Sequence, residues 1–222
     1  LLQSKMSEAS FQKLAAIDNE DVYAFIAHAI ELCEPDSVFV GDDSDEDVAY
    51  IRQLAIDQKE EIPLNTEGHT VHWDGYFDQA RKKDVTKYLV PEGVDLDKKL
   101  NQMPRDEGIK EMEDLQRGGY KGRKMLVRFF CLGTPNSVFA IPCLQITDSA
   151  YVCHSEDLLY RRGYEEFKRQ SKEHEHFEFF KYRHATGEVD ERNTSKNYEL
   201  NRVYMDYTEN TTLSVNTQYA GN

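Results

Sequence analysis

The sequence predicts an α/β fold, a mixed β-sheet with flanking helices. Apolar residues recur every three or four positions over 22–33, which is typical of an amphipathic helix. A short apolar segment at 37–40 is followed by a polar turn and a second helical pattern, as in a sheet with helices packed on it. Two longer apolar segments, 125–132 and 138–146, flank a Gly-Thr-Pro-Asn turn and indicate a β-hairpin.

The first helix has start and stop signals at both ends. Asp18 or Asn19 can cap its first turn, and Pro35 ends it because proline cannot donate the next backbone hydrogen bond. His28 lies off the apolar stripe, so we expect it to be exposed to solvent. The predicted inward face consists of Val22, Phe25, Ile26, Ala29, Ile30 and Cys33.

The second helix follows an acidic run at 42–47. An EF-hand calcium loop requires a glycine at its sixth position and a glutamate at its twelfth, and this run has neither. Acidic residues at a helix N-terminus complement the helix dipole, and this is the interpretation that we adopt. The predicted inward residues are Val48, Ile51, Leu54 and Ala55.

The remaining elements follow from local pattern and turn residues. We expect, in order, a strand at 86–90, surface helices over 95–116 interrupted at Pro104, the hairpin, a helix at 157–170, a strand at 176–184, a polar turn at 188–196, and one or two closing strands after 201. The hairpin core candidates are Phe130, Leu132, Phe139, Ile141, Leu144 and Ile146. One mixed α/β domain over residues 1–222 accounts for all of these elements.

Composition limits the class of protein. The net charge of −14 argues against a nucleic-acid surface as the main binding partner. No apolar run approaches the ~18 residues of a membrane span. The cysteines show no Cys-x-x-Cys spacing, and we predict buried, reduced thiols and a cytoplasmic protein; they are Cys33, Cys131, Cys143 and Cys153.

Three patterns typical of catalytic or metal sites are incomplete in this sequence. A phosphate-binding Walker loop needs four residues between its first two glycines, whereas three separate Gly118 from Gly122. Asp148, Ser149 and His154 have the residue types of a hydrolase triad but lack the Gly-x-Ser-x-Gly turn. The histidine pairs 69/72 and 174/176 each lack a third metal ligand nearby, so we expect no metal site at them.

Five short stretches, taken in order, resemble the N-terminal lobe of GTP-dependent phosphoenolpyruvate carboxykinase. They are "ELCEPDSVFVGDDSDED", "DQARKKDVTKYLV", "GYKGRKMLVRFFCLG", "LQITDSAYV" and "NTQYAGN". The resemblance runs from about Glu31 to Asn222 and implies the fold of that family's N-terminal domain. It also implies a fragment: the family's metal ligands, phosphate loop and guanine pocket are expected beyond Asn222, so no metal, GTP or catalytic residue is expected on this chain.

The resemblance implies a reaction and a set of substrate-binding residues. The family converts oxaloacetate and GTP to phosphoenolpyruvate, GDP and CO₂ with Mn²⁺ or Mg²⁺, a gluconeogenic step. Arg81 matches the arginine that binds the substrate carboxylate, since a guanidinium offers two parallel donors. Tyr219, Ala220 and Gly221 match the second substrate-binding turn, where a tyrosine ring edge and a backbone N–H can approach an anion.

Ala220 departs from the glycine of many relatives, so we expect an ordinary φ there and a contribution through its backbone. Two alternatives to an enzyme lobe remain: a non-catalytic α/β module that binds a small carboxylate, and a scaffold domain without a ligand. The encoded sequence beyond Asn222 would distinguish them.

Overall fold

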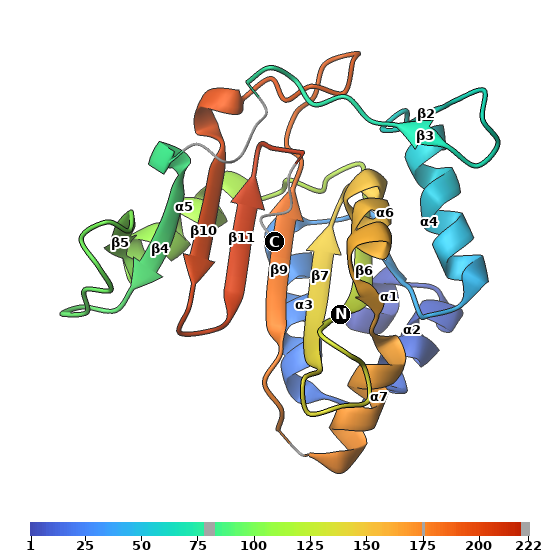
Figure 1. Ribbon diagram of the computed structural model, residues 1–222, viewed down its shortest axis with the longest axis horizontal. Helices are drawn as coiled ribbons and strands as arrows, with labels where there is room; N and C mark the ends of the chain where they lie inside the picture. The colour runs from blue at the N-terminus through green and yellow to red at the C-terminus, as the bar shows by residue number, and fades with distance from the viewer. Residues whose placement is uncertain (78–82, 175, 219–222) are drawn as a thin grey trace.

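The computed structural model describes residues 1–77, 83–174 and 176–218, which are organised about one mixed β-sheet (Figure 1). Nine of the strands in these residues form this sheet in the order β1-β6-β7-β9-β11-β10-β4-β5, with β8 paired to β6 beside this path. Their bounds are β1 Ser37–Val40, β4 Thr86–Val90, β5 Gln102–Pro104, β6 Lys124–Leu132, β7 Ile141–Thr147, β8 Arg161–Arg162, β9 Phe180–Ala185, β10 Arg202–Asp206 and β11 Thr211–Val215. A separate hairpin pairs β2 (Ile62–Pro63) with β3 (Thr70–Val71).

Helices cover both faces of the sheet. The α-helices of the described residues are α1 Leu2–Lys5, α2 Glu8–Ala15, α3 Glu20–Cys33, α4 Asp45–Asp57, α5 Arg105–Gln116, α6 Ala150–Leu159 and α7 Tyr164–Glu173, with short 3₁₀ helices η1 at Lys83–Val85 and η2 at Tyr198–Leu200. In Figure 1, α3 and α5 lie behind the sheet, and α6 lies in front of β6 and β7. The predicted fold class, a mixed sheet with flanking helices, is confirmed.

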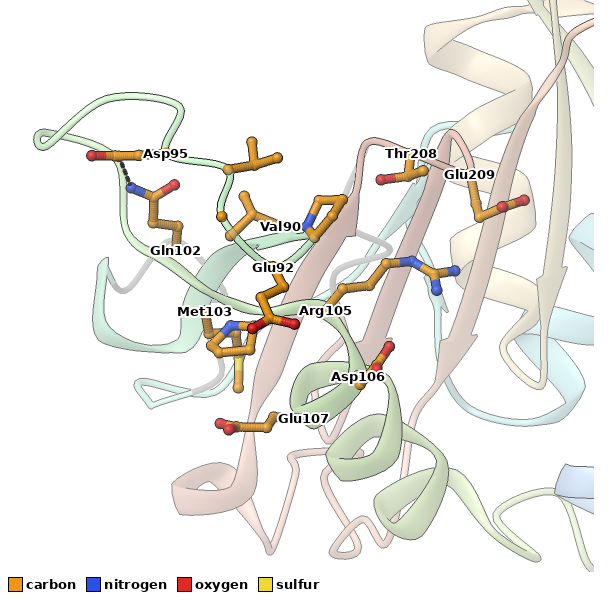
Figure 2. Close-up of a pocket in the computed structure, with 14 residues that line it drawn as sticks. Val90, Glu92, Asp95, Gln102, Met103, Arg105, Asp106, Glu107, Thr208 and Glu209 are labelled. Carbon is orange, nitrogen blue, oxygen red and sulfur yellow. Dashed lines mark hydrogen bonds between the residues drawn. The ribbon is translucent and has the colours of Figure 1, made fainter.

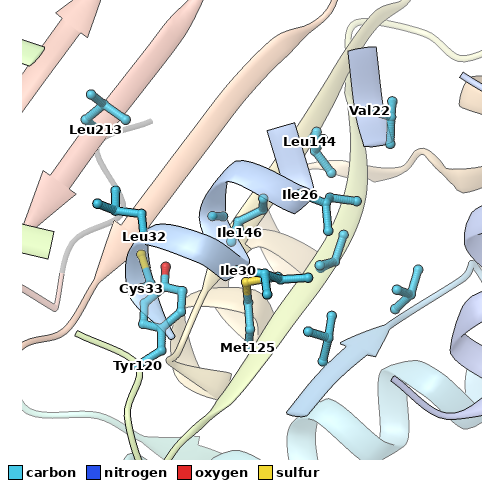
Figure 3. Packing of buried hydrophobic residues seen from close by; sticks show 14 of the residues in the cluster. Val22, Ile26, Ile30, Leu32, Cys33, Tyr120, Met125, Leu144, Ile146 and Leu213 are labelled. Carbon is cyan, nitrogen blue, oxygen red and sulfur yellow. The ribbon is translucent and has the colours of Figure 1, made fainter. Parts of the chain in front are cut away.

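The main core lies between α3 and the central strands (Figure 3). Val22, Ile26 and Ile30 point from α3 toward Leu144 and Ile146 of β7, and all five are buried. Met125 of β6 and Leu213 of β11 extend the same apolar layer. Burying such side chains contributes about 1.5–3 kcal/mol each, so this layer fixes α3 against the sheet.

The helix ends follow the predicted signals. The Asn19 side chain accepts a hydrogen bond from Val22 N at 3.0 Å, and α3 ends at Glu34, which adopts a left-handed conformation before Pro35. Ser44 caps α4, whose first turn carries three acidic residues, as the interpretation of the 42–47 run required. His28 is exposed as predicted. Ile51 and Ala55 are fully buried, and the other two predicted inward residues of α4 are half-buried.

Three element predictions are correct in part and wrong in their bounds or burial. Residues 95–101 form no helix, and α5 is not a surface helix: Gly108 packs on Leu89, and Met112 and Gln116 are fully buried against the sheet. The predicted helix at 157–170 is interrupted by β8 and Gly163, because a Cβ at Gly163 would lie 2.3 Å from the backbone of β6. The strand predicted at 176–184 begins at Phe180, since the preceding aromatic residues pack on α7 instead.

The hairpin prediction is confirmed in pairing and wrong in one boundary. β6 and β7 pair antiparallel, but β7 begins at Ile141 because residues 133–140 form a longer connection. Phe139 is 75% exposed and Ile141 40% exposed, so these two core candidates are wrong. Phe130, Leu144 and Ile146 are confirmed as buried, and Leu132 is half-buried.

All four cysteines are free and buried, as predicted. Burial raises the pKa of the Cys33 and Cys143 thiols to about 12, and it raises the pKa of Cys131 and Cys153 as well. These thiols therefore stay protonated and act as small apolar groups. In the described part of the chain, no helix is both long and apolar enough to cross a membrane.

Candidate active-site edge of the sheet

The sheet topology brings two distant segments to one edge. β10 pairs parallel with β4 and antiparallel with β11, so the start of β4 and the end of β11 lie at the same edge, separated by one strand. Two strand spacings place them about 10 Å apart. This edge is at the top of Figure 1, where the arrows of β7, β9 and β11 point. We call it the upper edge.

A polar segment at 190–198 contacts residues that precede β4 and residues that follow β11. The ring of Phe77 stacks on Tyr198 with centroids 4.6 Å apart, and a Cβ at Gly75 would lie 2.2 Å from the Thr194 side chain. On the other side, Gln218 Nε2 donates to Asn193 O at 3.1 Å. The predicted polar turn at 188–196 is therefore confirmed, and it links the two segments that converge at the upper edge.

An ion pair fixes the turn after β7. Arg123 Nη1 donates to Asp148 Oδ2 at 2.6 Å, and Nη2 donates to the Gly187 carbonyl at 2.9 Å. Asp148 Oδ1 accepts from Thr186 N at 2.9 Å, and the Asp148 side chain is completely buried. The carboxylate thus ties the ends of β7 and β9 together, and the guanidinium that neutralises it is one-third exposed at the upper edge.

A fully buried histidine lies between the ends of β7 and β11. His184 Nδ1 is 2.7 Å from Thr147 Oγ1, and Nε2 is 2.7 Å from the Thr217 carbonyl oxygen. Thr147 Oγ1 also accepts from Ser149 N at 3.0 Å. Burial lowers the pKa of His184, so the imidazole is neutral at neutral pH.

The residues of the rejected hydrolase triad have other partners. Ser149 caps α6 and donates through Oγ to Glu60 Oε2 at 2.7 Å, and His154 Nδ1 is 2.6 Å from Glu61 Oε1. Asp148 binds Arg123 instead of a histidine. The rejection on sequence grounds is therefore confirmed by geometry.

One histidine of each pair has another partner. His72 stacks on Tyr151 at 3.5 Å between ring centroids, and its Nδ1 lies 2.6 Å from the Glu60 carbonyl. His176 lies 3.9 Å from a carboxylate oxygen of Asp21 at an exposed surface. Within residues 1–77, 83–174 and 176–218, no group of three histidine, cysteine or acidic side chains is arranged to hold a metal ion.

A large cavity of about 930 Å³ lies at the opposite edge of the sheet, beyond the end of β4 (Figure 2). Its acidic lining residues are Glu92, Asp95, Asp106, Glu107 and Glu209. The one lining arginine, Arg105, forms an ion pair at 2.8 Å with buried Asp206. Uncompensated acidic groups repel a dianion such as oxaloacetate, so this cavity does not fit the predicted substrate.

The four residues predicted to bind substrate lie outside the described residues. These are Arg81, Tyr219, Ala220 and Gly221. The described neighbours of both segments, Phe77 with η1 on one side and Gln218 on the other, lie at the upper edge. Sequence reasoning missed the hydrogen bonds of His184 and the hydrogen bond that Glu60 accepts from Ser149 at the start of α6. A polar residue at a strand end, such as Thr147 or His184, was the available signal.

Comparison with known proteins assigns the family. The model of the phosphoenolpyruvate carboxykinase N-terminal domain matches residues 24–222. This chain belongs to that family. It is 50% identical over 221 residues to the phosphoenolpyruvate carboxykinase [GTP] of Thermococcus sibiricus, covering all of this chain and 35% of that protein.

Two further carboxykinases match the chain over the same length. The phosphoenolpyruvate carboxykinase [GTP] of Thermococcus kodakarensis is 49% identical and that of Saccharolobus solfataricus 40% identical, each over the whole of this chain. The alignments cover 35% and 34% of those proteins. The chain therefore spans about a third of the length of the curated carboxykinases that it matches. The expected family and its N-terminal domain fold are confirmed.

Proposed function

We propose that residues 1–222 are the substrate-anchoring N-terminal domain of an enzyme that converts oxaloacetate and GTP to phosphoenolpyruvate, GDP and CO₂. The observation that supports this function is the convergence at the upper edge. In a carboxykinase-family chain, the neighbours of the Arg81 segment and of the 219–221 turn meet there, although 138 positions separate Arg81 from Tyr219. A small dianion requires its binding groups within one substrate length of each other.

Each proposed binding residue has a chemical role in this reaction. The Arg81 guanidinium pairs with a substrate carboxylate through two parallel N–H donors. The electropositive ring edge of Tyr219 and the backbone N–H of Gly221 contact the same anion, and Ala220 contributes its backbone. Such contacts orient oxaloacetate so that loss of CO₂ leaves an enolate whose oxygen can attack the γ-phosphorus of GTP.

The cofactors are proposed to bind elsewhere in the enzyme. The described residues offer no set of metal ligands, so we derive no step through Mn²⁺ or Mg²⁺ from this chain. We propose that the metal ions and GTP bind residues beyond Asn222. The four protonated, buried thiols favour a cytoplasmic location for the enzyme.

The test is Arg81→Ala in the full-length enzyme, with Lys82→Ala as the matched control. Loss of a charged hydrogen-bonded partner of a substrate carboxylate should lower kcat/KM for oxaloacetate by about 100-fold. The neighbouring control should stay within about threefold. Neither variant should change the melting temperature or the KM for GTP. An Arg81→Ala enzyme with unchanged kcat/KM for oxaloacetate would contradict the assignment.

The alternative function is a non-catalytic module that binds a small carboxylate. Phosphoenolpyruvate formation by the full-length protein separates the two functions. On the proposed function, the purified 222-residue chain should form no phosphoenolpyruvate and should bind GTP no better than background. Turnover by the isolated chain would show that the nucleotide site has been placed wrongly.

A further inference from the structure

A buried chain of hydrogen bonds crosses the upper edge from the end of β7 to the end of β11. It runs from Ser149 N to Thr147 Oγ1 at 3.0 Å, from Thr147 to His184 Nδ1 at 2.7 Å, and from His184 Nε2 to Thr217 O at 2.7 Å. Thr147, Ser149, His184 and Thr217 are all completely buried. Because β9 lies between β7 and β11, its histidine side chain bridges the ends of both neighbouring strands.

The chemistry of the end groups fixes every proton in this chain. A carbonyl oxygen only accepts, so His184 Nε2 must carry the proton that it donates to Thr217. In the neutral imidazole, Nδ1 is then an acceptor, so the Thr147 hydroxyl must donate to it. The Thr147 hydroxyl then makes two hydrogen bonds: its oxygen accepts from Ser149 N–H, and its proton is donated to His184 Nδ1. The Thr217 carbonyl therefore requires the Nε2–H tautomer, and the Thr147 hydroxyl supplies the donor that Nδ1 of this tautomer needs.

The bond to Thr217 comes at the point where the chain leaves the sheet. Asn216 N donates to Ala185 O at 3.0 Å, continuing the backbone contacts of β11 with β9. One residue later the Thr217 carbonyl receives the imidazole N–H, and Gln218 then donates to Asn193 O. Tyr219 follows directly in the sequence.

We propose that His184, whose Nδ1 accepts from the Thr147 hydroxyl, is a positioning residue that fixes the backbone leading into the substrate-binding turn at 219–221. This inference rests on the proposed function of that turn. Binding through a backbone N–H and a ring edge tolerates displacements of only about 0.5 Å, so the carbonyl two residues before Tyr219 must be held. A neutral donor achieves this without adding a charge beside the substrate.

The test compares Thr147→Val with Thr147→Ser in the full-length enzyme. Valine keeps the side-chain shape but removes the donor to His184 Nδ1 and leaves that buried nitrogen without a partner, whereas serine keeps the hydroxyl. We expect Thr147→Val to lower kcat/KM for oxaloacetate about tenfold, the cost of one buried hydrogen bond, and Thr147→Ser to stay within about twofold of the wild type. The KM for GTP should be unchanged in both. A purely structural role would instead leave fewer active enzyme molecules. In that case, kcat/KM would fall by the same factor for oxaloacetate and for GTP.

Hydrogen exchange supplies a readout that does not depend on activity. Backbone amides of residues 216–222 should exchange about tenfold faster in Thr147→Val than in Thr147→Ser, while the amides of α3 stay unchanged as an internal reference. Unchanged exchange at 216–222 overturns the inference, and so does faster exchange with unaltered kcat/KM for oxaloacetate. If the wild-type enzyme forms no phosphoenolpyruvate, the proposed function fails, and exchange alone still decides whether the histidine holds this backbone.

Discussion

Phe130 and Phe139 provide a matched pair for testing the hydrophobic core. Both belong to the β6–β7 hairpin region and both look like core residues in the sequence, yet Phe130 is 1% exposed and Phe139 is 75% exposed. A phenylalanine buries 150–250 Å² when fully covered, which corresponds to roughly 4–6 kcal/mol of transfer free energy. Large-to-small changes at such sites cost about 3–5 kcal/mol, so we expect that loss for Phe130→Ala.

For Phe139→Ala, only about a quarter of the residue is covered, so the loss should be about 1–1.5 kcal/mol at most. Urea unfolding of the purified 222-residue chain, followed by circular dichroism, measures both losses, and similar m-values for the variants would validate the comparison. In thermal unfolding the Phe130→Ala loss corresponds to a decrease of roughly 6–20 °C in Tm. Equal losses for the two variants would refute the assignment of the hairpin faces.

Three further perturbations follow from the structure. Burial raises the pKa of Glu60, so its ionisation opposes folding: the free energy of unfolding should fall as pH rises from about 4 through the raised pKa. Glu60→Gln should flatten that profile, and an identical profile would contradict this. Gly41→Ala should cost about 3–5 kcal/mol in urea unfolding, because its Cβ would lie 2.5 Å from Arg128 Nη1 and break the buried pair with Asp157. Gly93→Ala adds no close contact but places alanine at a φ of +79°, so it should cost only about 1–2 kcal/mol. The thiols should resist Ellman's reagent until the chain unfolds, and rapid labelling of Cys33 in the native state would be inconsistent with its burial.

Local signals predicted the elements that depend on local interactions. The strands at 37–40 and 86–90 have the predicted bounds, and α3 begins and ends at its predicted caps. These signals failed where a distant segment decides the outcome. The charged pattern of α5 indicated a surface helix, but Gln116 is buried because it donates to carbonyls of β9 and β11, more than sixty residues away.

The loop after β6 failed for a steric reason. Val138 and Phe139 continue the apolar pattern of β7, yet Gly133 adopts a positive φ so close to Phe139 that a Cβ would lie 2.0 Å from its carbonyl oxygen. Pattern reasoning carries no information about such close backbone approaches. For the candidate site, the family resemblance supplied the residues and the sheet topology supplied their common edge, whereas the hydrogen bonds of His184 to Thr147 and Thr217 required atomic distances.

The place of the last hairpin in the sheet has a consequence for biosynthesis. Among the described residues, β10 and β11 come last in the sequence, but they insert between β9 and β4, and β4 pairs with β10 in a register that joins Thr86 to Val203. During synthesis on the ribosome, β4 therefore gains its partner β10 only after more than a hundred further residues have been made. Pairing across such a sequence separation is slow, and unpaired strand edges are prone to aggregation. β4 thus becomes joined to the rest of the sheet only once β10 has been made, in the step that also brings the end of β11 near the start of β4.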